Sequence, residues 1–166
     1  MTRKADKKGG KGTPATIAAT RGGAAFSLHP YTADGTSESY GAEAADALGV
    51  PHERIFKTLV AEVDGALVVA VVPVAGSLDL KALAAAAGGK RATMADPAAA
   101  ERSSGYVRGG ISPLGQRKPL PTVVDATAYD FPTIYVSAGR RGLQMELSPA
   151  DLAKLTNATT APIARP

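Results

Sequence analysis

The sequence predicts a single α+β domain in which helices pack around a mixed, mostly antiparallel and barrel-like central sheet. With 166 residues, 45% of them hydrophobic and 20% charged, the chain has the size and composition of one domain with its own core. Strand-like and helix-like runs follow one another without the strict βαβ rhythm of a parallel sheet. Two β-rich runs, Arg54–Val63 and Ala66–Val72, flank Asp64-Gly65, which is the strongest hairpin signal in the chain.

The elements before this hairpin are short. Thr13 suits a helix N-cap, a proline follows it, and Gly22 suits a helix stop, so we expect a helix over Pro14–Arg21. Phe26–Tyr31 favours a strand. The alanines and leucine of Gly41–Leu48 favour a second helix, which the glycine after it would end.

The second strand of the hairpin and the elements after it can be assigned in the same way. Ala66–Val72 is almost wholly apolar, which predicts a strand buried on both faces at the centre of a sheet. We expect Ser77 to cap a helix over Leu78–Ala87, and Asp96 with the proline after it to begin another helix. Lys90–Met94 between them is a candidate short strand.

The last part of the chain predicts three strands, Thr122–Asp125, Thr133–Ser137 and Leu143–Leu147, with a glycine-containing turn between the last two. A final helix should begin after Ser148 and end near Asn157. The domain is therefore expected over residues 13–157, with a mobile C-terminal tail over residues 158–166.

Residues 1–12 are expected to form a disordered basic tail. Five lysines and arginines stand there against one aspartate, which accounts for the whole net charge of +4. Such a tail can attract RNA nonspecifically or simply aid solubility. No apolar segment follows it as in a signal peptide, and no apolar run has the length of a membrane span, so we expect a cytoplasmic protein without membrane contact.

Several kinds of site are unsupported by the residues present. The chain has no cysteine, which excludes disulfides, thiolate metal sites and a cysteine nucleophile. Its two histidines, His29 and His52, form no visible cluster for a metal or a Ser-His-Asp triad. We expect neither a metal nor a cofactor.

The segment Gly105–Lys118 is the most distinctive stretch of the sequence. Its four glycines and one proline rule out a regular helix or central strand and predict a shaped loop. Gly109 and Gly110 allow positive φ and close approach of a ligand, while Pro113 stiffens the turn. Exposed amides in such a loop suit a carbonyl oxygen or a phosphate. On composition alone an ordinary connecting loop is the simpler interpretation.

Lys57 is a second candidate for a functional residue, although strand periodicity alone supports it only weakly. Strand alternation places it opposite Phe56, and a lysine on the exposed side of an antiparallel strand is commonplace.

The loop and five further segments, in the same order along the chain, resemble the YbaK family of bacterial Cys-tRNA(Pro) deacylases. The resemblance runs from about Thr13 to the C-terminus. The further segments are Ile55–Val60, Pro73–Leu80, Met94–Pro97, Leu120–Asp125 and Ile134–Leu143.

The resemblance implies a trans-editing hydrolase that deacylates Cys-tRNA(Pro), in which the substrate's own thiol attacks its ester carbonyl. It implies that Lys57 orients the acceptor end of tRNA, and that the backbone amides from Gly109 to Ser112 polarise the carbonyl. Lys57 and Gly109 are therefore the expected catalytic residues. The expected substrate-binding residues are Tyr31, Tyr40, Thr58, Gly110, Ile111, Ser112, Pro113, Ser137 and Gln144.

Two positions depart from the pattern of that family. Tyr40 stands where phenylalanine is frequent, and Gln144 where aspartate is common, which leaves the amino-acid preference open. Glu146 lies two residues further on the same strand face, so we expect it to replace the missing carboxylate in part.

Two other functions remain open at this point: deacylation of alanine or serine from tRNA, and a noncatalytic tRNA-binding module associated with a synthetase. The expected partners are the acceptor end of tRNA(Pro) and prolyl-tRNA synthetase. A local positive face is expected near the loop. Its residues would be Arg102, Arg108, Arg117, Lys118, Arg140 and Arg141.

Overall fold

The computed structural model describes residues 12–33 and 39–166, so the basic tail expected over residues 1–12 lies outside the described residues except for Gly12. The helices are α2 (Pro14–Arg21), α3 (Tyr40–Leu48), α4 (Leu80–Ala86), α5 (Pro97–Ser104), the 3₁₀ helix η1 (Ala126–Asp130) and α6 (Pro149–Thr156). The strands are β1 (Phe26–Pro30), β2 (Phe56–Val63), β3 (Ala66–Pro73), β4 (Ser77–Leu78), β5 (Ala92–Met94), β6 (Thr122–Asp125), β7 (Ile134–Arg140), β8 (Leu143–Leu147), β9 (Thr159–Ala161) and β10 (Ala164–Arg165). Among these helices none is long and apolar enough to cross a bilayer.

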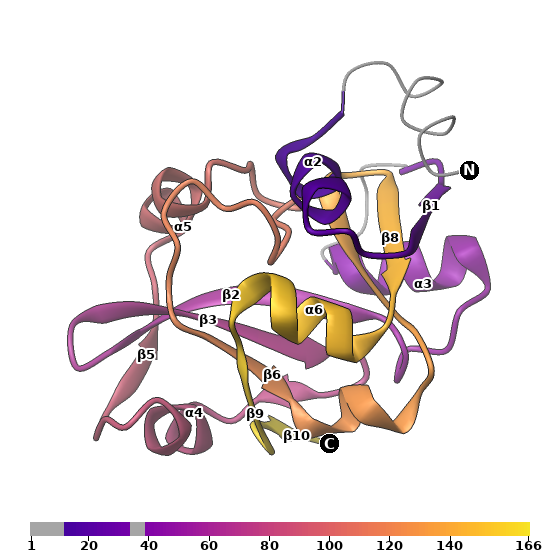
Figure 1. The fold of residues 1–166 in the computed structure, drawn as a ribbon. Coiled ribbons are helices and arrows are strands. Elements are labelled where there is room, and N and C mark those ends of the chain that lie inside the picture. The colour runs from indigo at the N-terminus through magenta and orange to yellow at the C-terminus, as the bar shows by residue number, and fades with distance from the viewer. Residues whose placement is uncertain (1–11, 34–38) are drawn as a thin grey trace.

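The strands form a five-stranded sheet of order β5-β2-β3-β6-β9, a three-stranded sheet of order β1-β8-β7 and a small β10-β4 pair (Figure 1). In the five-stranded sheet β2 is antiparallel to β3 and β5, whereas β6 is parallel to β3 and β9. The predicted α+β class with a mixed sheet is therefore confirmed. The sheets stay separate and do not close into a barrel, and an isolated parallel bridge between Ile55 and Tyr135 connects the two larger ones.

The hairpin between β2 and β3 has the turn that the sequence predicts. Val63 pairs with Ala66, and the two turn residues, Asp64 and Gly65, both have positive φ values of 50° and 87°. This is the backbone of a type I′ turn, which asparagine, aspartate and glycine tolerate best.

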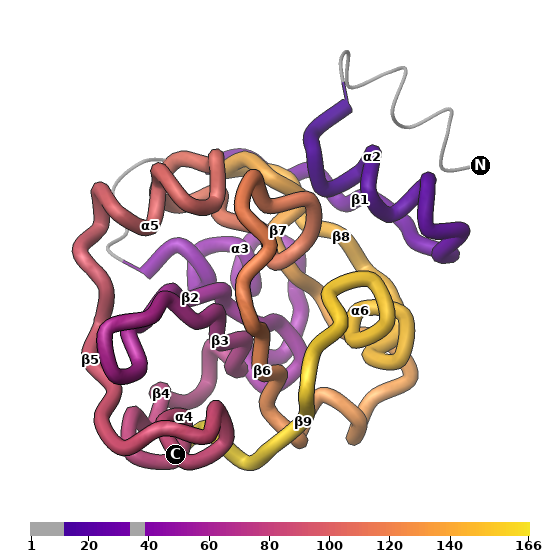
Figure 2. The backbone as a smooth tube through the Cα atoms, turned by 60° about the vertical axis from the view of Figure 1, so that its left-hand side comes forward, coloured from indigo at the N-terminus to yellow at the C-terminus, as the bar shows by residue number. Residues whose placement is uncertain are grey.

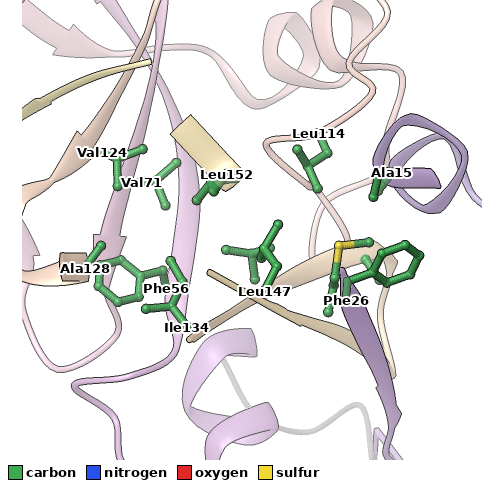
Figure 3. Packing of buried hydrophobic residues seen from close by; sticks show 14 of the residues in the cluster. Ala15, Phe26, Phe56, Val71, Leu114, Val124, Ala128, Ile134, Leu147 and Leu152 are labelled. Atoms are coloured by element: carbon green, nitrogen blue, oxygen red, sulfur yellow. The ribbon is translucent and has the colours of Figure 1, made fainter. Parts of the chain in front are cut away.

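Strand β3 lies at the centre of the five-stranded sheet, as its apolar sequence predicts. Alternation sends Val69 and Val71 into the core that the two larger sheets share, where α6 contributes Leu152 (Figure 3). Val68, Ala70 and Val72 face the opposite side and pack with Leu83 of α4. The same strand therefore supplies the two larger hydrophobic clusters, which explains why nearly all of its residues are apolar.

The start of α4 differs from the expectation. The cap is Asp79, whose carboxylate accepts a hydrogen bond from the Ala82 amide at 3.0 Å. Ser77 instead belongs to β4, because its strand is paired with Arg165 near the C-terminus. Pairing with a sequence-distant segment thus places Ser77 and Leu78 in a two-residue strand, and the helix begins after it.

The prediction of a mobile tail over residues 158–166 is wrong. Strand β9 runs beside β6, and the chain then reaches α4, where Ile163 is fully buried (Figure 2). The buried carboxylate of Asp125 accepts hydrogen bonds from the amides of Ile163 and Ala164, each at 2.9 Å. These bonds hold the segment in place, and no local pattern in its own sequence signals them.

Replacing Asp125 with alanine should lower the free energy of unfolding by about 3 kcal/mol, because buried amides would lose a charged acceptor. Urea denaturation followed by circular dichroism measures the change. Asp130→Ala, an exposed aspartate at the end of η1, is the control and should change stability by less than about 0.5 kcal/mol. Equal effects of the two substitutions would contradict this anchoring role.

Candidate active site

A cavity of about 460 Å³ opens beside β2, between α3, α5 and the loop that follows α5. This volume is within the range of small-molecule sites. Eight of the eleven residues predicted as the site line this cavity. They are Tyr31, Tyr40, Lys57, Thr58, Gly109, Ile111, Ser137 and Gln144.

The register of three strands brings part of this set together. Ile55 forms a parallel bridge with Tyr135, so Lys57 and Ser137, each two residues further on, come to the same level of β2 and β7. Ser137 in turn pairs with Gln144 of β8. The three side chains form a row across the strands on the side that lines the cavity.

Lys57 is partly buried and, within the described residues, makes no salt bridge. Its neighbour Phe56 enters the hydrophobic core, so the lysine must point the other way. Burial of the ammonium lowers the pKa of Lys57 from its usual value. The cavity therefore contains a cation that is not neutralised by the protein.

The loop after α5 is held by its own buried side chains. The hydroxyl of Tyr106 donates to the Leu114 carbonyl at 2.5 Å, and burial raises the pKa of that phenol. The Ser112 hydroxyl accepts from the Leu114 amide at 3.2 Å, and both Ser112 and Pro113 are buried. Ser112 and Pro113 do not line the cavity. They are buried residues of the loop that support its shape.

Gly110 also lies behind the surface of the cavity. Its amide donates to the Val107 carbonyl at 2.9 Å, and a methyl group added at this glycine would lie 2.7 Å from the Arg140 Cα. The Gly110 amide is therefore already used in a hydrogen bond within the loop. By contrast, the amides of Gly109 and Ile111 donate to no group in the part of the chain that the structure describes.

Gly109 faces Tyr40 across the cavity wall. It has φ of +90°, and a methyl group added there would lie 3.1 Å from the ring of Tyr40. The Arg141 guanidinium carbon also lies over this ring, 4.6 Å from the ring centroid. The Arg141 guanidinium also donates to Glu43 Oε1, at 2.9 and 3.1 Å, so this cation is neutralised and fixes the ring.

Two buried oxygen atoms, both from residues that line the cavity, have no hydrogen-bond partner among the described residues. They are Oγ1 of Thr58 and Oε1 of Gln144, whose residue is only 7% exposed. Buried polar atoms without partners are rare in folded proteins and require a reason.

Glu146 does not replace a cavity carboxylate, contrary to the expectation from its strand face. It accepts hydrogen bonds from Thr133 at 2.6 Å and from His29 at 2.9 Å, and these lower its pKa. The Arg54 guanidinium lies 3.3 Å from Oε2 of Glu146, the oxygen that also accepts from Thr133. Glu146 is absent from the lining of the cavity, because its contacts with Thr133, His29 and Arg54 hold it elsewhere.

Some lining residues were not predicted as part of the site, including Met94, Pro97, Glu101 and Arg108. Met94 and Pro97 belong to a segment that carries the family resemblance, which was the available signal. Glu101 accepts a hydrogen bond from the Arg108 amide at 2.8 Å, and nothing in the local sequence indicates that contact. In the described ranges no three histidine, aspartate or glutamate side chains gather as a metal site would require.

The sequence profile of the aminoacyl-tRNA editing domain matches residues 36–155 of this chain. The chain belongs to the aminoacyl-tRNA editing domain family. Its catalytic class is that of an aminoacyl-tRNA deacylase, an enzyme that hydrolyses the ester between an amino acid and tRNA.

Relatives of this editing domain agree in sequence and in fold. EbsC of Enterococcus faecalis, named as a candidate Cys-tRNA(Pro)/Cys-tRNA(Cys) deacylase, is 45% identical over 120 residues, which cover 72% of this chain and 73% of EbsC. The crystal structure of the hypothetical protein APE2540 matches with a TM-score of 0.81 at 25% identity, over 92% of this chain and 99% of that one. A structure described as a candidate trans-editing enzyme for prolyl-tRNA synthetase has the same fold. It matches with a TM-score of 0.81 at 24% identity, over 92% of this chain and 96% of that one.

Replacing Gly109 with alanine should displace the ring of Tyr40 and lower deacylation by about 100-fold, since small displacements of a site can cost that much. Gly65→Ala is a matched control, because Gly65 has a similar φ of +87° but open space around its Cβ position. Both variants should lose about 1–2 kcal/mol of stability from the left-handed backbone. Thermal melts and deacylation rates of the two proteins test this, and equal activity in both would contradict the role of the Tyr40 contact.

Proposed function

We propose that this editing domain removes cysteine from mischarged Cys-tRNA(Pro) by using the substrate's own thiol. The observation that carries the proposal is the pairing, in one cavity, of an unneutralised lysine with two free loop amides. No histidine lines this cavity within the described residues, so its hydroxyl groups lack a neighbouring imidazole base. A substrate that brings its own nucleophile suits such a site.

The proposed reaction needs few groups from the protein. The cysteinyl thiolate attacks its own ester carbonyl, a carbon–sulfur bond forms, and the carbon–oxygen bond to the ribose breaks. The 3′ oxygen takes a proton and leaves as the tRNA hydroxyl, and water then opens the thiolactone to free cysteine. The amides of Gly109 and Ile111 would stabilise the oxyanion that develops on the carbonyl.

Lys57 has two roles in this proposal. Its ammonium would orient the ribose and phosphate at the tRNA 3′ end, and its field would favour the thiolate over the neutral thiol. The lowered pKa of Lys57 gives these roles a pH limit, because the ammonium is lost as the pH rises through that pKa.

The relatives support the substrate class without deciding the tRNA. The name of EbsC couples cysteine with both tRNA(Pro) and tRNA(Cys), and the structural relative is described as acting for prolyl-tRNA synthetase. From these descriptions of the relatives we propose that the present chain acts in the cytoplasm on the acceptor end of tRNA, with prolyl-tRNA synthetase as its partner. We also propose residues 13–157 as the boundaries of the editing unit, with β9 and β10 packed onto it.

A panel of aminoacyl-tRNAs tests the substrate. Cys-tRNA(Pro) should be deacylated at least about 100-fold faster than Ala-tRNA(Pro) or Ser-tRNA(Pro), because an intramolecular nucleophile has a large effective concentration. Hydrolysis of Ala-tRNA(Pro) at the same rate would reject the thiol mechanism and favour a bound water. Adding Cys-tRNA(Cys) to the panel measures the discrimination between tRNAs, with and without the synthetase.

Lys57→Met should reduce deacylation by about 100-fold or more, in the range seen when one electrostatic group of an active site is removed. Its melting temperature should stay the same or rise, because the substitution relieves the burial of an unpaired cation. Lys81→Met, at an exposed lysine of α4, is the control and should leave both properties unchanged. Unchanged turnover in a folded Lys57→Met protein would remove this lysine from the site.

A further inference from the structure

Glu101 is the one carboxylate among the described residues that line the cavity, and the proposed reaction gives it no role. It lies near the C-terminal end of α5. A negative charge at that end of a helix is unfavourable, because the helix dipole already places partial negative charge there. The stability of α5 therefore does not account for this side chain.

Glu101 holds both ends of the short segment that leads from α5 to the cavity wall. Its backbone carbonyl accepts the Gly105 amide at 2.9 Å, where the helix ends. Its carboxylate Oε2 accepts the Arg108 amide at 2.8 Å, three residues later. A single residue thus fixes the turn over residues 105–108 against the helix. The second bond is charge-assisted, and such bonds are stronger than those between neutral groups.

The bond to Arg108 completes the hold on one peptide unit. That unit joins Val107 to Arg108, and while its N–H donates to Glu101, its C=O accepts from the Gly110 amide at 2.9 Å. The next unit carries the N–H of Gly109, which donates to no group among the described residues. Because peptide units are planar, only φ and ψ of Arg108 separate the held unit from this free N–H. The direction of the Gly109 N–H therefore depends on how its neighbour is held.

We propose that Glu101 is a positioning residue for deacylation, which acts through the Arg108 amide to keep the Gly109 amide directed at the ester carbonyl. This inference rests on the proposed function, because it takes the Gly109 amide as a donor to the developing oxyanion. Glu101 acts as a hydrogen-bond acceptor and not through its charge. A negative charge near an oxyanion opposes its formation, so an uncharged acceptor of the same length can serve equally well.

Two substitutions at this position separate the acceptor from the charge. Glu101→Gln keeps an acceptor oxygen on a side chain of the same length, and should deacylate Cys-tRNA(Pro) within about threefold of the wild-type rate. Glu101→Ala removes the acceptor and should lower the single-turnover rate at saturating enzyme about 100-fold, as loss of an oxyanion donor does. The enzyme concentration that gives half of this rate should change less than about twofold, because the positioned amide acts mainly in the transition state.

Asp96→Ala is the matched control for a general effect on α5. The Asp96 carboxylate also accepts a backbone amide of this helix, that of Ala99 at 3.3 Å, but at the end away from the turn. Its loss should lower the melting temperature about as much as Glu101→Ala does, and should change the deacylation rate by less than about twofold.

Hydrogen exchange of the Arg108 amide reports the contact directly. Protection of this amide should persist in Glu101→Gln and in Asp96→Ala, and should fall roughly tenfold or more in Glu101→Ala. An Arg108 amide that is unprotected in the wild-type protein would show that the contact does not hold the turn in solution.

Three kinetic results would each overturn the proposal. Equal losses of rate in Glu101→Gln and Glu101→Ala mean that the charge is required. A raised half-saturation concentration at an unchanged rate means that Glu101 binds the substrate. An equal loss of rate in Asp96→Ala means that the stability of α5 is the cause.

The same variants measured with Ala-tRNA(Pro) keep this test apart from the thiol mechanism. An oxyanion forms on the ester carbonyl whether a thiolate or water attacks, so Glu101→Ala should lose the same factor on both esters. If the wild-type protein hydrolyses both esters equally fast, the thiol mechanism fails, while a loss confined to Glu101→Ala still supports the positioning role. A loss on Cys-tRNA(Pro) alone overturns that role, because the effect would follow the thiol and not the oxyanion.

Discussion

The bridge between Ile55 and Tyr135 is the constraint on which the candidate site depends. It joins the five-stranded sheet to the three-stranded one, and so determines which residues of β2 and β7 lie level with each other. Because side chains alternate along a strand, the same arrangement sends Phe56 into the shared core and Lys57 into the cavity. A register shift of one residue would exchange them, placing the ammonium in the core.

The charges of the site are arranged in two ways that have different purposes. Arg141 with Glu43, and Arg54 with Glu146, are paired in contacts that position Tyr40 and Tyr135. The first pair fixes the cavity wall at Tyr40, the second lies outside the lining of the cavity, and both add little net field. Lys57 has no such partner among the described residues, so its charge acts on whatever enters the cavity.

The loop after α5 acts as a rigid part of the site because other elements close around it. Gly115 packs against the backbone of Pro14 so tightly that a methyl group would not fit, and the Thr13 hydroxyl donates to the carbonyl of Ala138 on β7. Helix α2, which lies against the end of the three-stranded sheet in Figure 1, therefore supports the loop from behind. This support lets two amides remain free without the loop losing its shape.

The sequence by itself determined the features that depend on neighbouring residues. Thr13 and Ser148 cap helices, Asp64-Gly65 makes the hairpin turn, and the apolar run of β3 lies at the centre of its sheet. Each follows from local backbone preference or from alternation, which a short window of sequence contains.

Tertiary structure alone decided the contacts between distant segments. It placed Gly109 in the cavity wall and Gly110, Ser112 and Pro113 beneath it, and it gave Glu146 to a cluster away from the cavity. It also turned the expected C-terminal tail into two strands anchored by Asp125. The physical reason is that burial and hydrogen-bond partners depend on which residues the fold brings together, and such residues can be as far as 125 positions apart in the chain.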